Sequence, residues 1–141
     1  MSYFLVAAQF VLIALIAWPF APPAFTLLDL GLFGAGIGVA LAAVATMGAR
    51  TISVLPEPRA GGELVTHGIY RIVRHPMYLA VLLCALAAGL AYQSSAKWAL
   101  VALLAAVLAL KIRREERLLR RRFDGYAAYA RRTRALLPFI L

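Results

Sequence analysis

Four long apolar runs constrain this chain more than any other feature of its sequence. They cover about residues 3–20, 25–47, 77–92 and 96–110, and polar or proline-containing stretches separate them. A helix needs about 20 apolar residues to cross the hydrocarbon core of a bilayer. The chain is 64% hydrophobic, its mean hydropathy is +0.84, and its 141 residues suit one domain. We therefore predict an all-α integral membrane protein in which residues 1–141 form one domain with about four transmembrane helices.

Helix-breaking residues set the limits of these runs. Pro19, Pro22 and Pro23 follow the first run, and proline cannot continue a helix interior. The sequence Gln93-Ser94-Ser95 predicts a tight turn that makes the third and fourth runs a hairpin. No basic residue precedes the first run, which argues against a cleaved signal peptide and for a retained helix.

Glycines are concentrated in the second run. Gly34 and Gly38 have the GxxxG spacing, and Gly31 and Gly36 lie nearby. Because glycine has no side chain, such a helix face allows another helix to approach closely. We therefore expect close packing through these glycines, either within one chain or between chains.

The basic residues orient the molecule in the membrane. Of the 15 lysines and arginines, 14 fall on the side that holds Met1: four arginines in the loops, then Lys111 and nine arginines in the tail, whereas the other side has only Lys97. This asymmetry predicts a multi-pass protein with both termini and the active site in the cytoplasm. The net charge of +9 is explained by topology rather than by nucleic acid, and we expect the basic tail to contact anionic lipid headgroups.

The segment Tyr70-Arg71-Ile72-Val73-Arg74-His75-Pro76-Met77-Tyr78 is a candidate site because polar side chains at a lipid boundary must be solvated or paired. Pro76 favours an extended His75 and suits the first position of the following helix. The helix start that His75 caps is suited to bind an anion, and Gly68 allows the chain to bend before Tyr70. The alternative is an interfacial belt of arginines and tyrosines, which does not account for the Arg-His-Pro order.

The basic tail contains two acids on an apolar stripe. If residues 111–123 are helical, Glu116 shares a face with Ile112, Leu119 and Phe123, and Glu115 lies beside it. Four-residue spacing also allows local pairs of Glu115 with Lys111 and of Glu116 with Arg120. Such pairs contribute only about 0.2–0.5 kcal/mol, so the inward position favours ligand binding.

These motifs in this order resemble the isoprenylcysteine carboxyl methyltransferase family and the related phospholipid methyltransferases. The resemblance covers roughly residues 61–141. It rests on Leu64-Val65-Thr66-His67-Gly68-Ile69-Tyr70, on Arg74-His75-Pro76-Met77-Tyr78, on Glu115-Glu116, on Tyr126 and Tyr129, and on Leu137-Pro138-Phe139-Ile140.

The resemblance implies an integral-membrane enzyme that uses S-adenosyl-L-methionine without a Rossmann domain. Its cofactor region comprises residues 61–78 and 111–132, closed by a C-terminal amphipathic cytoplasmic helix. Lys111 stands where the prenylcysteine enzymes have an arginine near the substrate, and Ala80 replaces a common glycine. No catalytic residue or metal site is assigned. The implied cofactor-binding residues are Gly62, Glu63, Leu64, Val65, Tyr70, His75, Pro76, Met77, Tyr78, Glu115 and Glu116.

The acceptor decides whether a base is needed. A prenylcysteine carboxylate is already ionised, whereas an ethanolamine ammonium must lose a proton first, and only His67 and His75 could easily accept it. This favours a carboxylate or thiolate acceptor over an amine, and the resemblance implies carboxyl O-methylation of a lipidic or prenylated acceptor that enters from the bilayer. Phospholipid N-methylation and small-thiol S-methylation stay open, as do an NADPH-dependent sterol-type reductase and a non-catalytic lipid-binding protein.

Overall fold

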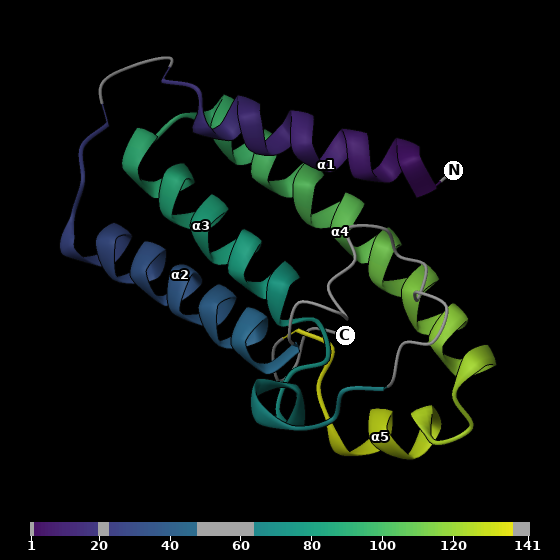
Figure 1. The fold of residues 1–141 in the computed structure, drawn as a ribbon. Helices are drawn as coiled ribbons and strands as arrows, with labels where there is room; N and C mark the ends of the chain where they lie inside the picture. Colours follow the sequence, from purple (N-terminus) through teal and green to yellow (C-terminus); the bar gives the residue numbers. More distant parts are fainter. Residues whose placement is uncertain (1, 20–22, 48–63, 137–141) are drawn as a thin grey trace.

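The computed structural model describes residues 2–19, 23–47 and 64–136, and within these ranges the chain is helical with no β-strand longer than an isolated bridge. The elements in chain order are α1 (Ser2–Ala17), α2 (Leu27–Met47), the short 3-10 helix η1 (Gly68–Arg71), α3 (Pro76–Tyr92), α4 (Ser95–Arg122) and α5 (Tyr126–Arg132). In the bundle, α3 lies between α1 and α2, while α4 runs along α1 (Figure 1). The all-α prediction is confirmed for these residues.

Two of the four predicted spans reach membrane-crossing length. α2 has 21 residues and the apolar part of α4 also passes the length criterion, whereas α1 and α3 are apolar helices of 16 and 17 residues. At 1.5 Å per residue, α1 and α3 would be about 24–26 Å long, a little less than the hydrocarbon core. The structure thus supports a membrane protein with two helices of full spanning length.

The end of α4 differs from the sequence prediction. Residues 96–110 were expected to form a span and residues 111–123 a separate cytoplasmic helix, but one helix continues from Ser95 to Arg122. Between Leu110 and Arg122 the sequence has no glycine or proline, and lysine, arginine and glutamate are good helix formers. The polar tail is therefore a rigid extension of the span, about 42 Å long as a whole.

Of the four glycines that the sequence placed on a close-packing face of α2, Gly36 packs closely against α3, whereas Gly31, Gly34 and Gly38 do not. A Cβ atom on Gly36 would lie 2.6 Å from Cys84 Sγ and 3.0 Å from the Ala80 carbonyl oxygen. At Gly34 and Gly38 it would have no neighbour within 4 Å. The GxxxG face therefore makes no close helix contact within the described part of this chain.

Lys97 is not a solvated loop charge at the far end of the bundle. Its side chain is buried, and Nζ donates hydrogen bonds to the carbonyl oxygens of Leu15, Ile16 and Trp18 at 2.5–2.9 Å. Nζ also lies 4.5 Å from the centre of the Tyr92 ring. The last carbonyl groups of a helix lack partners within the helix, so Lys97 caps α1 and fastens it to α4.

Candidate functional site

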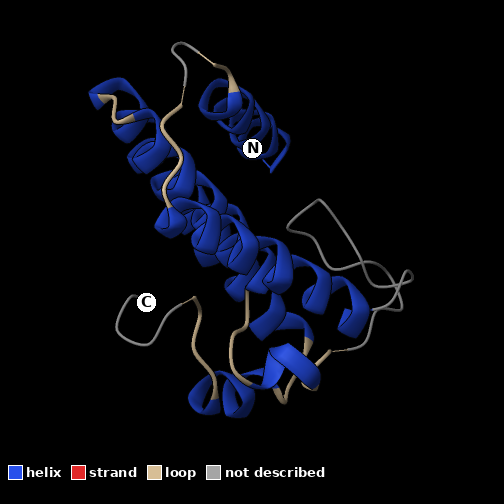
Figure 2. Cartoon of the chain, turned by 90° about the vertical axis from the view of Figure 1, so that its left-hand side faces the viewer, coloured by secondary structure: helices blue, strands red, loops and turns tan. Residues whose placement is uncertain are grey.

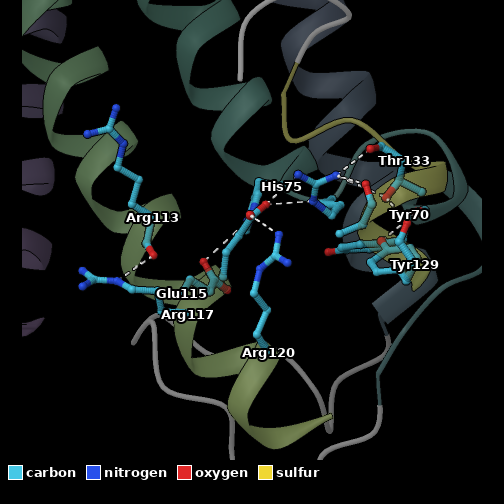
Figure 3. A network of polar contacts seen from close by, with 11 residues as sticks. Tyr70, His75, Arg113, Glu115, Arg117, Arg120, Tyr129 and Thr133 are labelled. Atoms are coloured by element: carbon cyan, nitrogen blue, oxygen red, sulfur yellow. Dashed lines mark hydrogen bonds and ion pairs between the residues drawn. The ribbon is translucent and has the colours of Figure 1, made fainter. Parts of the chain in front are cut away.

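The two halves of the predicted cofactor region come together at one end of the bundle. There the loop before α3 meets the charged end of α4, while η1 and α5 lie beside them (Figures 1 and 2). Figure 3 shows His75 facing Glu115 across this junction, with Tyr70, Tyr129 and Thr133 grouped next to it. We call Arg74, His75, Glu115 and Glu116 the charged cluster.

Arg74 is the most connected side chain of the charged cluster. Its Nε and Nη2 lie 2.8 and 2.7 Å from Glu116 Oε1. Its Nη1 donates to the carbonyl oxygens of Ala130 and Thr133 at 3.0 and 2.5 Å. Arg120 Nη2, on the outer side, is 3.8 Å from Glu116 Oε2, the four-residue pair that the sequence suggested. Arg74 therefore joins α4 to the end of α5.

His75 lies between the two acids. Nδ1 is 3.5 Å from Glu115 Oε2 and Nε2 is 3.5 Å from Glu116 Oε1. Burial alone would lower the pKa of the imidazole, but the neighbouring carboxylates of Glu115 and Glu116 outweigh it and raise the pKa above its ordinary value. The ring also stacks on Tyr78, with centroids 5.7 Å apart. His75 is thus favoured as an imidazolium that can donate from both nitrogens.

His75 and Pro76 begin α3 as the sequence predicts, with His75 at the N-cap and Pro76 at the first helical position. The His75 side chain makes no capping hydrogen bond. Its backbone carbonyl accepts from the N–H groups of Tyr78 and Leu79 at 3.1 Å, and its own N–H donates to Ala135. These bonds occupy most of the backbone groups at the start of α3. A charged ligand would therefore bind to the side chains of the charged cluster rather than to the backbone of the helix end.

Residues 133–136 form a further wall that carries no sequence motif. Arg74 N donates to the Arg134 carbonyl oxygen at 2.7 Å, and Arg134 N donates to that of Ile72 at 3.0 Å. Val73 and Arg134 form an isolated parallel bridge, and Ala135 and Leu136 are buried. The end of the described chain is therefore pinned against the loop that positions His75.

Tyrosines line the side of the charged cluster near α5. Tyr129 Oη donates to the Tyr70 carbonyl oxygen at 2.7 Å. Burial, assisted by the charge of Glu115, raises the pKa of Tyr70 to about 12, and burial raises the pKa of Tyr129 to about 12 as well. Tyr126 is buried, and Arg120 lies 5.8 Å from its ring centre. Phenols with such pKa values stay protonated and act as hydrogen-bond donors at neutral pH.

Lys111 lies deeper than the charged cluster. The residue is only 1% exposed, and its ammonium donates to Gln9 Oε1 of α1 and lies 5.1 Å from the centre of the Tyr78 ring. Since Tyr78 in turn stacks on His75, Lys111 is one side chain removed from the cluster.

Three buried polar atoms in this region lack a hydrogen bond of good geometry: His75 Nε2, Glu115 Oε2 and Tyr126 Oη. The contacts at 3.5 Å between His75 and the acids are longer than ordinary hydrogen bonds. Buried polar atoms without partners are costly in a protein. The long contacts of His75 with the two acids are therefore weak, and Tyr126 Oη has no hydrogen bond within the described residues.

The remaining predicted residues fall in different places. Leu64 and Val65 are half-buried before η1, Pro76 is buried at the helix start, and Met77 is exposed away from the charged cluster. Gly62 and Glu63 lie outside the described residues. Sequence reasoning did not assign a site role to Arg74, Tyr126 or Tyr129, although their motifs were noted, and nothing in the sequence marks Thr133.

Known proteins provide an independent comparison. The chain is 37% identical over 113 residues to the cobalt-zinc-cadmium resistance protein CzcN of Cupriavidus metallidurans, a match that covers 79% of this chain and 49% of that protein. It is 33% identical over 138 residues to the nickel-cobalt-cadmium resistance protein NccN of Alcaligenes xylosoxydans xylosoxydans, which covers 94% and 62%. The chain thus spans about half to three fifths of the length of these relatives.

A family model described as phospholipid methyltransferase matches residues 25–125. The match includes α2, the loop before α3, all of α3 and α4, and therefore every residue of the charged cluster. It confirms the resemblance drawn from the motifs. Because it covers more than half of the sequence, this chain belongs to the phospholipid methyltransferase family.

Proposed function

We propose that this chain is an S-adenosyl-L-methionine-dependent methyltransferase that modifies a membrane-embedded or lipidic acceptor, most like isoprenylcysteine carboxyl O-methyltransferases. The observation that carries the proposal is the charged cluster, where His75, Glu115 and Tyr126 present buried polar atoms without good partners at the cytoplasmic end predicted from the charges. Membership of the family supports methyl transfer as the reaction class.

The residues of the charged cluster suit the polar groups of this cofactor. Glu115 Oε2 can accept from an ammonium or a ribose hydroxyl, and His75 Nε2 and Tyr126 Oη can donate to a carboxylate. The raised pKa of His75 favours the donor form of its ring. Tyr78, which stacks on His75, offers an aromatic wall.

The chemistry asks little acid–base work of the protein. When bound, S-adenosyl-L-methionine would supply a methyl group activated on a sulfonium for transfer to an acceptor oxygen. The chain's own part is to align the two reactants and exclude water. Arg74 fixes Glu116 and the wall at residues 133–136, and the buried tyrosines keep that side dry.

Binding experiments separate the enzyme classes. Calorimetric titration of the purified, detergent-solubilised protein with S-adenosylhomocysteine should release heat, whereas titration with NADPH should not. His75→Ala and Glu115→Ala should abolish this binding, and Arg121→Ala, an exposed arginine on α4, should leave it unchanged. Binding of NADPH alone would indicate a reductase, and binding of neither would indicate a non-catalytic lipid-binding protein.

The acceptor class needs a separate assay. A panel of prenylcysteine, phosphatidylethanolamine and small-thiol acceptors with isotopically labelled cofactor should give the fastest transfer to the prenylcysteine carboxylate. His75, held between two acids and favoured as an imidazolium, is a poor base for an ammonium acceptor. Transfer to phosphatidylethanolamine with prenylcysteine left untouched would reject the O-methylation assignment and retain the cofactor site.

The names of the relatives add a physiological setting. Both are called resistance proteins for cobalt and cadmium, with zinc or nickel as well. Within the described residues no three histidine, cysteine, aspartate or glutamate side chains form a group that could hold a metal ion. We infer that any part this chain has in metal tolerance depends on methyl transfer. Loss of tolerance in cells that carry Glu115→Ala at normal protein level tests that inference, and unchanged tolerance contradicts it.

The basic surface fits the proposed position at the cytoplasmic membrane face. Arg113, Arg117, Arg120 and Arg121 are exposed along the end of α4, where they can contact anionic headgroups. Accessibility of single cysteines introduced near each end of α4 to a membrane-impermeant thiol reagent tests the orientation. Labelling of the arginine end from the outside of intact cells would contradict it.

A further inference from the structure

Gln9 and Lys111 form a polar pair inside the hydrophobic bundle. Between Phe4 and Ala17, Gln9 is the only polar side chain of α1. Gln9 is 7% exposed and Lys111 is 1% exposed, and the Lys111 ammonium donates to Gln9 Oε1. Polar and ionisable side chains inside a membrane protein are costly and commonly functional. The pair therefore points to a role beyond helix packing.

Three helices meet at the Lys111 ammonium. α1 runs along α4 (Figure 1) and supplies Gln9. α3 supplies Tyr78, whose ring centre lies 5.1 Å from Lys111 Nζ and whose ring also stacks on His75. Lys111 itself belongs to α4, four residues before Glu115. The ammonium is thus held next to the charged cluster by residues of the two neighbouring helices.

Glu115 is a competing partner for this ammonium. Side chains four residues apart on a helix are neighbours, with Cβ atoms about 5–6 Å apart, so Lys111 can reach Glu115. In the structure Lys111 donates to Gln9 instead, and Glu115 Oε2 lies 3.5 Å from His75 Nδ1. The local pair of Lys111 with Glu115 that the sequence spacing allows is therefore not formed.

Loss of the Gln9 amide would change this balance. A buried charge that has lost its partner is strongly destabilising, and Glu115 is the acid one helical turn away on α4. Lys111 would then turn toward Glu115 and compete with His75 for its carboxylate. An ammonium or hydroxyl group of a ligand would meet the same competition. Gln9 therefore keeps the Glu115 carboxylate available because it satisfies Lys111.

We propose that Gln9 is a positioning residue of the cofactor site: its amide holds Lys111 away from Glu115 and so leaves the Glu115 carboxylate to His75 and to the cofactor. The proposal rests on the proposed function, because it assigns Glu115 to the cofactor. Gln9 lies outside the match to the family model, which begins at residue 25, so family membership gives Gln9 no role.

The first test measures S-adenosylhomocysteine binding by calorimetry, with the full-length protein in lipid nanodiscs. If Lys111 pairs with Glu115 in about nine tenths of Gln9→Leu molecules, the affinity should fall roughly tenfold. The double variant Gln9→Leu/Lys111→Met removes the competing ammonium and should restore the affinity. Gln9→Glu keeps an acceptor for Lys111 and should bind as the wild type does. Phe10→Leu, at a 52% exposed neighbour on α1, is the control and should change nothing.

The second test follows the titration of His75 by NMR and needs no cofactor. The chain has two histidines, so a His67→Gln background leaves the His75 signal alone. The neighbouring carboxylates raise the pKa of His75. If Lys111 takes the Glu115 carboxylate in Gln9→Leu, the pKa of His75 should fall, and the double variant should restore it. The charged or titratable side chains that face His75 from α3 and α4 are Tyr78, Glu115 and Glu116.

Each outcome supports or rejects a distinct claim. Equal affinity and an equal His75 pKa in the wild type and Gln9→Leu would overturn the positioning role. An equal loss in Gln9→Leu and in the double variant would also overturn it, because Gln9 would then act through packing alone. The expected pattern of His75 pKa values without any binding of S-adenosylhomocysteine would reject the proposed function and leave the control of Glu115 by Gln9 in place. Gln9→Met repeats both measurements if Gln9→Leu does not fold.

Discussion

Replacement of Arg74 by alanine tests whether one side chain holds the site together. Arg74 contacts Glu116 Oε1 at 2.7 and 2.8 Å and donates to the Thr133 carbonyl oxygen at 2.5 Å. The side chains are only 10% and 17% exposed, so solvent screens the pair weakly. Removal of one partner of a buried pair costs about 3–5 kcal/mol. Since both groups keep some solvent contact, we expect a loss near the lower limit, about 3 kcal/mol.

Thermal unfolding in detergent measures that loss. At about 2–4 °C per kcal/mol for a chain of this size, Arg74→Ala should lower Tm by about 6–12 °C. Amide hydrogen exchange should also accelerate at residues 133–136, since their anchor is lost. Arg71→Ala is the matched control, because Arg71 is an exposed arginine of the same segment, and its effect should stay within about 0.5 kcal/mol. Equal Tm values for the two variants would refute the conclusion that Arg74 stabilises the fold by linking Glu116 to Thr133.

Three further predictions concern other parts of the fold. The pKa of His75 is raised in the folded protein, so its contribution to stability is complete below the ordinary pKa of about 6.5 and is lost as pH rises through the folded pKa. Tm should therefore fall as pH rises in the wild type, and this fall should disappear in His75→Gln. An identical dependence of Tm on pH in the two proteins would contradict the prediction. Gly68→Ala should lower the free energy of unfolding, measured by chemical denaturation, by about 1–2 kcal/mol, because φ of Gly68 is +56° and the new Cβ would lie 2.5 Å from Thr46 Oγ1. Gly125→Ala is the control and should leave stability unchanged, because Gly125 has a negative φ and no atom lies within 4 Å of the new Cβ. Lys97→Met should leave carbonyl groups of α1 unpaired and destabilise by about 1–3 kcal/mol, and an unchanged Tm would show that the cap is dispensable.

The helices follow from local sequence features. The predicted runs 25–47 and 77–92 end within two residues of α2 and α3, because apolar residues and helix breakers are read within a few positions. The length of α4 is missed, since the apolar pattern stops at Leu110 while good helix formers continue to Arg122. Hydropathy marks where lipid ends and does not mark where a helix ends.

Contacts between distant segments need the structure. The GxxxG spacing describes one helix, but the rotation of α2 against α3 decides which glycine is at the interface, and that glycine is Gly36. The pairing of Glu116 with Arg74 joins residues 42 positions apart, and the bonds of Thr133 with Arg74 span 59. Sequence reasoning placed both acids on the inward face, yet nothing in it could choose Arg74 as their partner over the neighbouring Arg71.

The continuity of α4 has a mechanical consequence. One unbroken helix carries Lys97 near its start and Glu116 near its end, 19 residues or about 28 Å apart, and His75 belongs to a different helix. Helices adjust to bilayer thickness by tilting. We therefore expect that the tail length of the surrounding lipid changes the distance between His75 and the carboxylates of Glu115 and Glu116. Membrane thickness would in this way alter the geometry of the site.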